Sequence, residues 1–66
     1  MELAVNGKPV LMAQGSNLFD LLSHLRLDPS VVVVEVNRTV IEKESFGVHA
    51  LSAGDAVEIL RFVGGG

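Results

Sequence analysis

The sequence predicts one small α+β domain, in which a mixed sheet of four or five strands is covered on one face by a single helix. Strand-like segments stand on both sides of one leucine stripe that has helical spacing. The chain has 66 residues, of which 48% are apolar and 20% charged, so it can fold but has room for only one core. We expect a folded domain over residues 1–63 and a flexible glycine tail over residues 64–66.

A hairpin is expected at the start of the chain, with strands over residues 1–5 and 8–13. Asn6-Gly7 lies between them, and this dipeptide is the one that best tolerates the positive φ angles of a type I′ turn. Pro9 has no N–H to donate, so the second strand is expected at an edge of the sheet. Its inward side chains would be Val10 and Met12.

One helix is expected between Asn17 and Pro29. Asn17 stands three residues before Asp20, which is the spacing of a weakened capping box. Apolar residues then follow at i, i+3, i+4 and i+7 and predict one buried helix face, formed by Leu18, Leu21, Leu22 and Leu25. The crossover through this helix is long enough to place the second and third strands parallel.

Three further strands are expected in the second half of the chain. Residues 31–36 are valine at every position except Glu35 and predict a central strand. A turn at Asn37-Arg38 leads to a short strand over residues 39–41, and the last strand covers residues 56–63. The expected core consists of Leu21, Leu22, Leu25, Val34, Val36, Val57 and Ile59.

Composition excludes several classes of chemistry. Cysteine is absent, so disulfides, thiolate metal sites and thiol nucleophiles are excluded. The net charge of −3 without a basic run argues against a nucleic-acid partner, and the longest apolar run, residues 31–34, argues against a membrane. His24 and His49 lack the spacing of a metal or catalytic pair, so neither catalytic nor metal-ligating residues are expected. The cytoplasm is the expected compartment.

The three glycines at residues 64–66 are the strongest candidate for a functional feature. On composition alone they are a disordered end. They follow directly on the last strand, however, and Gly66 places a carboxylate at the tip. A tail without side chains can pass through a narrow channel and present that carboxylate to a partner enzyme.

Several of these features together resemble the ubiquitin-like sulfur carriers, and at this length the ThiS-type carriers of thiamine biosynthesis. The resemblance covers nearly the whole chain and rests on Asn6-Gly7, Asn17-Leu18 with Leu21-Leu22, Val34-Glu35-Val36-Asn37, Gly54-Asp55 and Gly65-Gly66. It implies a β-grasp fold and a carrier that is not an enzyme. It also implies that an activating enzyme uses Mg-ATP to adenylate Gly66, which then becomes a thiocarboxylate, and that no cofactor is bound stably.

The implied partners are the activating enzyme, thiazole synthase and a sulfur donor such as a cysteine desulfurase. Gly64 and Gly65 would thread into the partner's active site. A docking surface is expected on the sheet face away from the helix, although a small domain exposes some apolar groups in any case; it consists of Ala4, Val33, Leu60, Phe62 and Val63. The alternatives are a carrier for molybdopterin or another pathway, and a ubiquitin-like interaction module or modifier.

Overall fold

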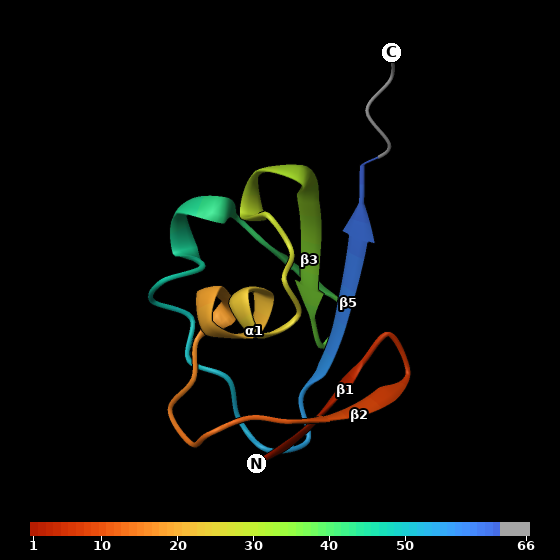
Figure 1. Cartoon of the computed structure of the whole chain (residues 1–66), viewed down its shortest axis with the longest axis vertical. Coiled ribbons are helices and arrows are strands. Elements are labelled where there is room, and N and C mark those ends of the chain that lie inside the picture. The colour runs from red at the N-terminus through yellow and green to blue at the C-terminus, as the bar shows by residue number, and fades with distance from the viewer. Residues whose placement is uncertain (63–66) are drawn as a thin grey trace.

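The computed structural model describes residues 1–62, which form a five-stranded sheet with one α-helix against it (Figure 1). This arrangement confirms the predicted α+β class. Residues 63–66, which hold the expected tail and the end of the last predicted strand, lie outside the described residues. The elements are β1 (Glu2–Val5), β2 (Lys8–Leu11), α1 (Leu18–His24), η1 (Pro29–Val31), β3 (Val32–Val36), β4 (Thr39–Ile41), η2 (Lys43–Ser45) and β5 (Ala56–Arg61).

The last strand of the chain lies in the middle of the sheet. The strand order is β2-β1-β5-β3-β4, with β1 and β5 parallel and all other neighbours antiparallel. β2 is an edge strand, as Pro9 predicts. The crossover through α1 does place β2 and β3 in the same direction, but β1 and β5 lie between them.

Both hairpins turn at an asparagine with positive φ. In the first hairpin, Asn6 has φ 49° and Gly7 has φ 81°, as the predicted type I′ turn requires. In the second, Asn37 has φ 51° and Arg38 has φ 70°. The two turns therefore share one backbone geometry, although only the first has glycine at its second position.

The helix begins at the predicted cap. The backbone N–H of Asp20 donates to Oδ1 of Asn17 at 2.9 Å, and the N–H of Asn17 donates to Oδ2 of Asp20 at 2.8 Å, so the capping box is complete. The helix ends at His24, well before Pro29. Arg26 then adopts a left-handed conformation with φ 59°, and the N–H of Leu27 closes the end on the carbonyl of Leu22 at 2.9 Å.

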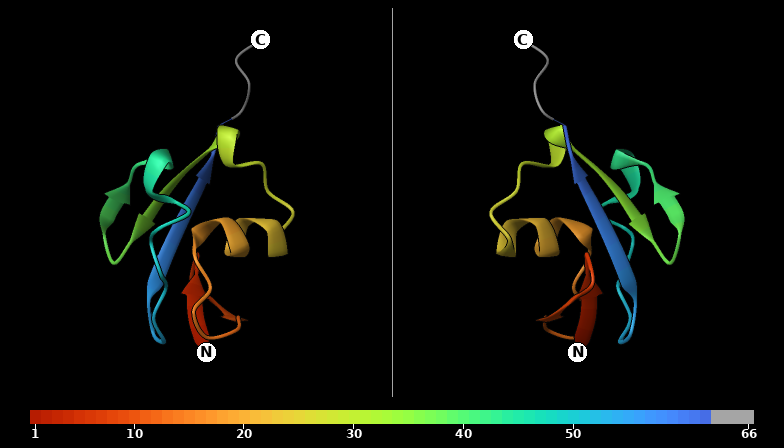
Figure 2. Two further views of the ribbon diagram at one scale, coloured as in Figure 1. Left: turned by 90° about the vertical axis from the view of Figure 1, so that its left-hand side faces the viewer. Right: turned by 90° about the vertical axis from the view of Figure 1, so that its right-hand side faces the viewer.

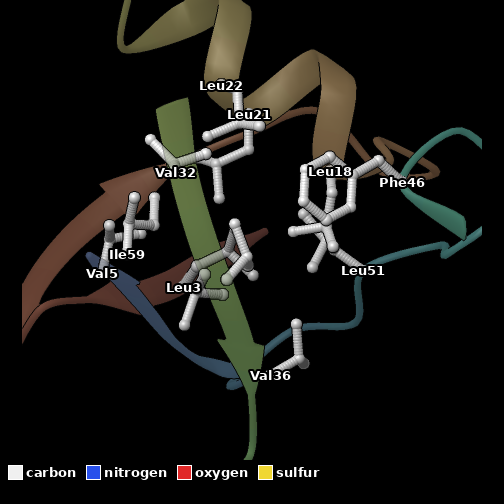
Figure 3. Packing of buried hydrophobic residues seen from close by; sticks show 12 residues of the cluster. Leu3, Val5, Leu18, Leu21, Leu22, Val32, Val36, Phe46, Leu51 and Ile59 are labelled. Carbon is white, nitrogen blue, oxygen red and sulfur yellow. The ribbon is translucent and has the colours of Figure 1, made fainter. Parts of the chain in front are cut away.

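The core lies between α1 and one face of the sheet (Figure 3). Six of the seven predicted core residues are buried. Leu25 is only half-buried, because it caps the helix end and packs against the margin of the core. Leu18, which was predicted on the buried helix face, is also part of the buried cluster. The cluster further contains residues that the prediction of the core did not include: Leu3, Val5, Val32, Phe46 and Leu51.

β4 has the predicted bounds, and the other strands differ from the predicted ones by one or two residues at an end. Val31 belongs to η1 rather than to the strand, because Asp28 caps a short turn by accepting the N–H of Ser30 at 2.9 Å. β2 ends at Leu11 rather than at residue 13. β5 ends at Arg61 within the described chain.

The two faces of the sheet differ in cover. α1 and the segment that contains η2 lie against one face, and the other face carries no helix among residues 1–62 (Figure 2). Val10 and Met12 are half-buried on the covered face, as predicted. Within the described chain, no helix has the length and apolar character needed to cross a lipid bilayer.

Candidate functional site

The candidate site is the end of β5, because the chain continues from there toward Gly66. Five residues of β5 pair with β3, from the pair Val36 with Val57 to the pair Val32 with Arg61. The N–H of Phe62 then donates to the carbonyl of Val31 at 2.8 Å, one residue beyond the strand. The backbone is therefore held by the sheet to within four residues of Gly66.

Three of the predicted docking residues come together at this end of the sheet. Val33 is directly opposite Leu60 in the register of β3 and β5, and Phe62 follows on the same face of the chain. Leu60 and Phe62 are each 60% exposed, while Val33 is half-buried. We call Val33, Leu60 and Phe62 the apolar patch. It lies on the face without a helix, because its residues alternate along the chain with the buried residues Val32, Val34 and Ile59.

The other predicted site residues are not part of the apolar patch as described. Ala4 is exposed, but it pairs with Ala56 at the start of β5. Four residues of strand separate Ala56 from Leu60, which corresponds to about 13 Å. Val63 and the tail glycines Gly64, Gly65 and Gly66 lie outside the described residues.

The same face carries a pair of carboxylates that the prediction of the site did not include. Glu35 on β3 is directly opposite Glu58 on β5, and on its other side Glu35 faces Val40, which is 56% exposed. Charges of the same sign that face each other on neighbouring strands repel each other and destabilise the sheet. Glu58 lies between the buried residues Val57 and Ile59 and therefore faces outward, but its pairing with Glu35 depends on the register, which the sequence does not specify.

The described chain offers no metal or ligand pocket. No group of three His, Asp or Glu side chains within residues 1–62 is placed to hold a metal ion, and no pocket is detected. Hydrogen bonds from the backbone N–H of Ser30 and then from its hydroxyl hold the pKa of Asp28 below its usual value. Asp28 caps η1 and is not part of the apolar patch.

Comparison with known proteins gives relatives over the full length of the chain. A profile of the ThiS family matches residues 1–66. The sulfur carrier protein ThiS of Bacillus subtilis is 38% identical over 65 residues, which are 97% of this chain and 98% of that protein. A thiazole synthase from Magnetococcus marinus is 35% identical over 66 residues, and this chain spans only 20% of its length.

Solved structures agree with this assignment. The crystal structure of the thiamine biosynthesis protein ThiS from Geobacter metallireducens has a TM-score of 0.85 and 45% sequence identity, with both chains covered completely. Its likeness identifies the five-stranded mixed sheet and single helix as the ubiquitin-like β-grasp fold that the resemblance implied. The chain belongs to the ThiS family and is a sulfur carrier of thiamine biosynthesis, not an enzyme.

Proposed function

We propose that the chain carries sulfur as a thiocarboxylate on Gly66 and delivers it to thiazole synthase. The observation that carries this proposal is that the three glycines begin two residues after Phe62, whose backbone N–H is still hydrogen-bonded beyond the end of the central strand β5. Such a strand gives the tail a fixed starting point. Glycine has no side chain, so the residues that follow can enter a narrow channel in a partner.

The proposed chemistry takes place at the carboxylate of Gly66. One carboxylate oxygen attacks the α-phosphorus of ATP, the bond from that phosphorus to the bridging oxygen breaks, and pyrophosphate leaves. Hydrosulfide then attacks the acyl carbon of the adenylate, the carbon–oxygen bond breaks, and AMP leaves with the formation of the thiocarboxylate and release of a proton. The activating enzyme supplies Mg²⁺ and the phosphate contacts, so the carrier itself binds no cofactor stably.

We place the docking surface for the activating enzyme at the apolar patch. Leu60 exposes a large aliphatic side chain and Phe62 a large aromatic one, beside the residues that lead to Gly66. Buried aromatic anchors dominate the binding energy of many protein interfaces. Ala4 would lie at the margin of such an interface, and Val63 would continue it toward the tail.

Thiazole synthase is the proposed acceptor of the sulfur. Two relatives with that name, from Magnetococcus marinus and Paramagnetospirillum magneticum, each contain a region similar to this whole chain. A carrier domain within a thiazole synthase chain supports a physical association between the two. A cysteine desulfurase is the proposed sulfur donor, and the cytoplasm, where ATP is available to the activating enzyme, is the proposed compartment.

Intact-mass measurement tests the proposal. The chain is incubated with an activating enzyme that serves a ThiS relative, Mg-ATP and sodium sulfide, and it is expected to gain the mass difference between sulfur and oxygen. Deletion of Gly66 moves the terminal carboxylate by ~3.3 to 3.6 Å and should abolish the gain, because a misplacement of about 1 Å can already cost ~10²-fold in rate.

Gly65→Val is the matched variant for the narrow-channel argument, since it keeps the length of the tail and adds only a β-branched side chain. It should also fail to gain mass. A normal gain in this variant would contradict the channel while leaving Gly66 as the reactive group. No gain in the unmodified chain, or its attachment to lysines of other proteins, would contradict the carrier chemistry.

A further inference from the structure

Asn6 binds the central strand with its side chain as well as with its backbone. Its N–H donates to the carbonyl of Val57 at 2.8 Å. Its Oδ1 accepts the N–H of Ile59 at 2.8 Å, and its Nδ2 donates to the carbonyl of Ile59 at 3.2 Å. The side-chain amide therefore offers Ile59 the donor and acceptor that a peptide group of a neighbouring strand would offer.

This contact extends the parallel pairing of β1 and β5 by one step. The strands pair through Ala4 with Ala56 and Val5 with Val57, after which β1 ends and the chain turns at Asn6-Gly7. Ile59, four residues before Val63, is thus held on the β1 side by a side chain 53 residues away in sequence. On the other side, β3 holds the strand as far as Phe62.

Asn37 makes a comparable set of contacts at the opposite end of β5. Its N–H donates to the carbonyl of Ala56 at 2.8 Å, and its Oδ1 accepts the N–H of Ala56 at 2.9 Å. Its Nδ2 donates to Oδ1 of Asp55 at 3.0 Å. Both asparagines are exposed, both start a two-residue turn at φ near 50°, and each makes two side-chain hydrogen bonds. They differ in their distance along the strand from Gly66.

We propose that Asn6 is a positioning residue for the carrier reaction: by holding Ile59 on the β1 side, it fixes the direction in which β5 delivers the tail to the partner's active site. This inference rests on the proposed function of Gly66. Seven residues separate Ile59 from Gly66, so the point and direction from which the tail starts depend on how the end of β5 is held. Asn37 contacts Ala56, which is ten residues before Gly66 at the start of β5, where β1 and β3 both flank the strand. Asn37 therefore has no such role.

The test compares Asn6→Gly with Asn37→Gly. Glycine is chosen because both positions have positive φ, so each variant loses two side-chain hydrogen bonds without the steric cost that alanine would add. Both variants should unfold at a lower temperature than the unmodified chain, by similar amounts. NMR measures the rate at which the Ile59 amide hydrogen exchanges with solvent. In Asn6→Gly this rate should rise by more than the exchange rates of the β3 amides rise.

The decisive readout is pyrophosphate exchange catalysed by the activating enzyme, measured well below both unfolding transitions. We expect Asn6→Gly to lower kcat about tenfold with a nearly unchanged KM for the carrier, since misplacement by about 1 Å can cost up to ~10²-fold. Asn37→Gly should leave kcat unchanged. If Asn6→Gly does not fold, Asn6→Asp and Asn37→Asp are compared instead. Aspartate keeps the acceptor for the N–H of Ile59 or Ala56, but it loses the donor and adds a negative charge, which faces the Ile59 carbonyl in one variant and the Asp55 carboxylate in the other.

A native kcat in Asn6→Gly would overturn the proposal. So would an equal fall of kcat in both variants, because the effect would then follow from overall stability. No exchange with the unmodified chain would overturn the proposed function of Gly66, and this inference with it.

Discussion

The two faces of the sheet follow different physical rules. On the face toward α1, side chains such as Val34 and Val57 are 0% and 1% exposed and belong to one continuous core. On the other face, Leu60 and Phe62 are each 60% exposed, and Glu35 is directly opposite Glu58. Exposed apolar groups and facing like charges do not favour folding. The inner face therefore stabilises the fold, and the outer face is where we propose contact with partner proteins.

The largest expected effect is on the inner face. Leu22→Ala should lower the free energy of unfolding by ~2 to 5 kcal/mol, because Leu22 is fully buried and its truncation leaves a cavity between helix and sheet. A domain of this size has a total stability of about that order, so the variant is expected to be largely unfolded. Chemical denaturation followed by circular dichroism measures the change.

Leu60→Ala is the matched control on the outer face. Because Leu60 is exposed, its truncation should change the free energy of unfolding by no more than about 0.5 kcal/mol. Wild-type-like unfolding of Leu22→Ala would show that the core is not where we place it. A large loss in Leu60→Ala would show that the outer face also supports the fold.

A smaller effect, on binding alone, is expected for Phe62→Asp. The fold should persist because Phe62 is exposed, but the activating enzyme should bind about 10 to 100 times more weakly, since the interface would bury an unpaired charge. Isothermal titration calorimetry with the purified activating enzyme measures the affinity. Val48→Asp is the control, because Val48 is 83% exposed and lies outside the sheet.

Equal affinities of Phe62→Asp and the unmodified chain would remove the apolar patch from the interface. Equal losses in Phe62→Asp and Val48→Asp would show that the added negative charge, and not its place, weakens binding. Loss of the folded NMR spectrum in Phe62→Asp would mean that the ring supports the core.

Most of the inner face could be predicted from the sequence because its signals are local. Leucines at helical spacing, the Asn17–Asp20 cap and the Asn6-Gly7 turn each depend on residues within one or two turns of each other. Phe46 has no such signal, because it is a single apolar residue after a polar segment. Its burial depends on the distant helix, where its ring meets Phe19 edge-on at a centroid distance of 5.8 Å.

The candidate site was predictable in part, for the same reason. The alternation within the last predicted strand, residues 56–63, correctly placed Leu60 and Phe62 outward. The sheet order was not predictable, because strand pairing depends on contacts between segments far apart in the sequence. The position of Ala4 beside Ala56, the facing pair Glu35 and Glu58, and the contact from Asn6 to Ile59 all follow from that order.

The smallest expected effect is a gain in stability from a change on the outer face, where the two facing carboxylates repel each other. Glu58→Gln removes one of two facing carboxylates and should raise the free energy of unfolding by ~0.2 to 0.5 kcal/mol at low salt. Glu2→Gln is the control: it makes the same change in net charge on β1, but Glu2 is opposite Leu11 and not another carboxylate. Denaturant titrations of both variants at low and high salt measure the difference, which should shrink as salt screens the repulsion. A gain of the same size in Glu2→Gln would trace the effect to the net charge of −3, and no gain in Glu58→Gln would show that the facing pair is not a cost to the fold.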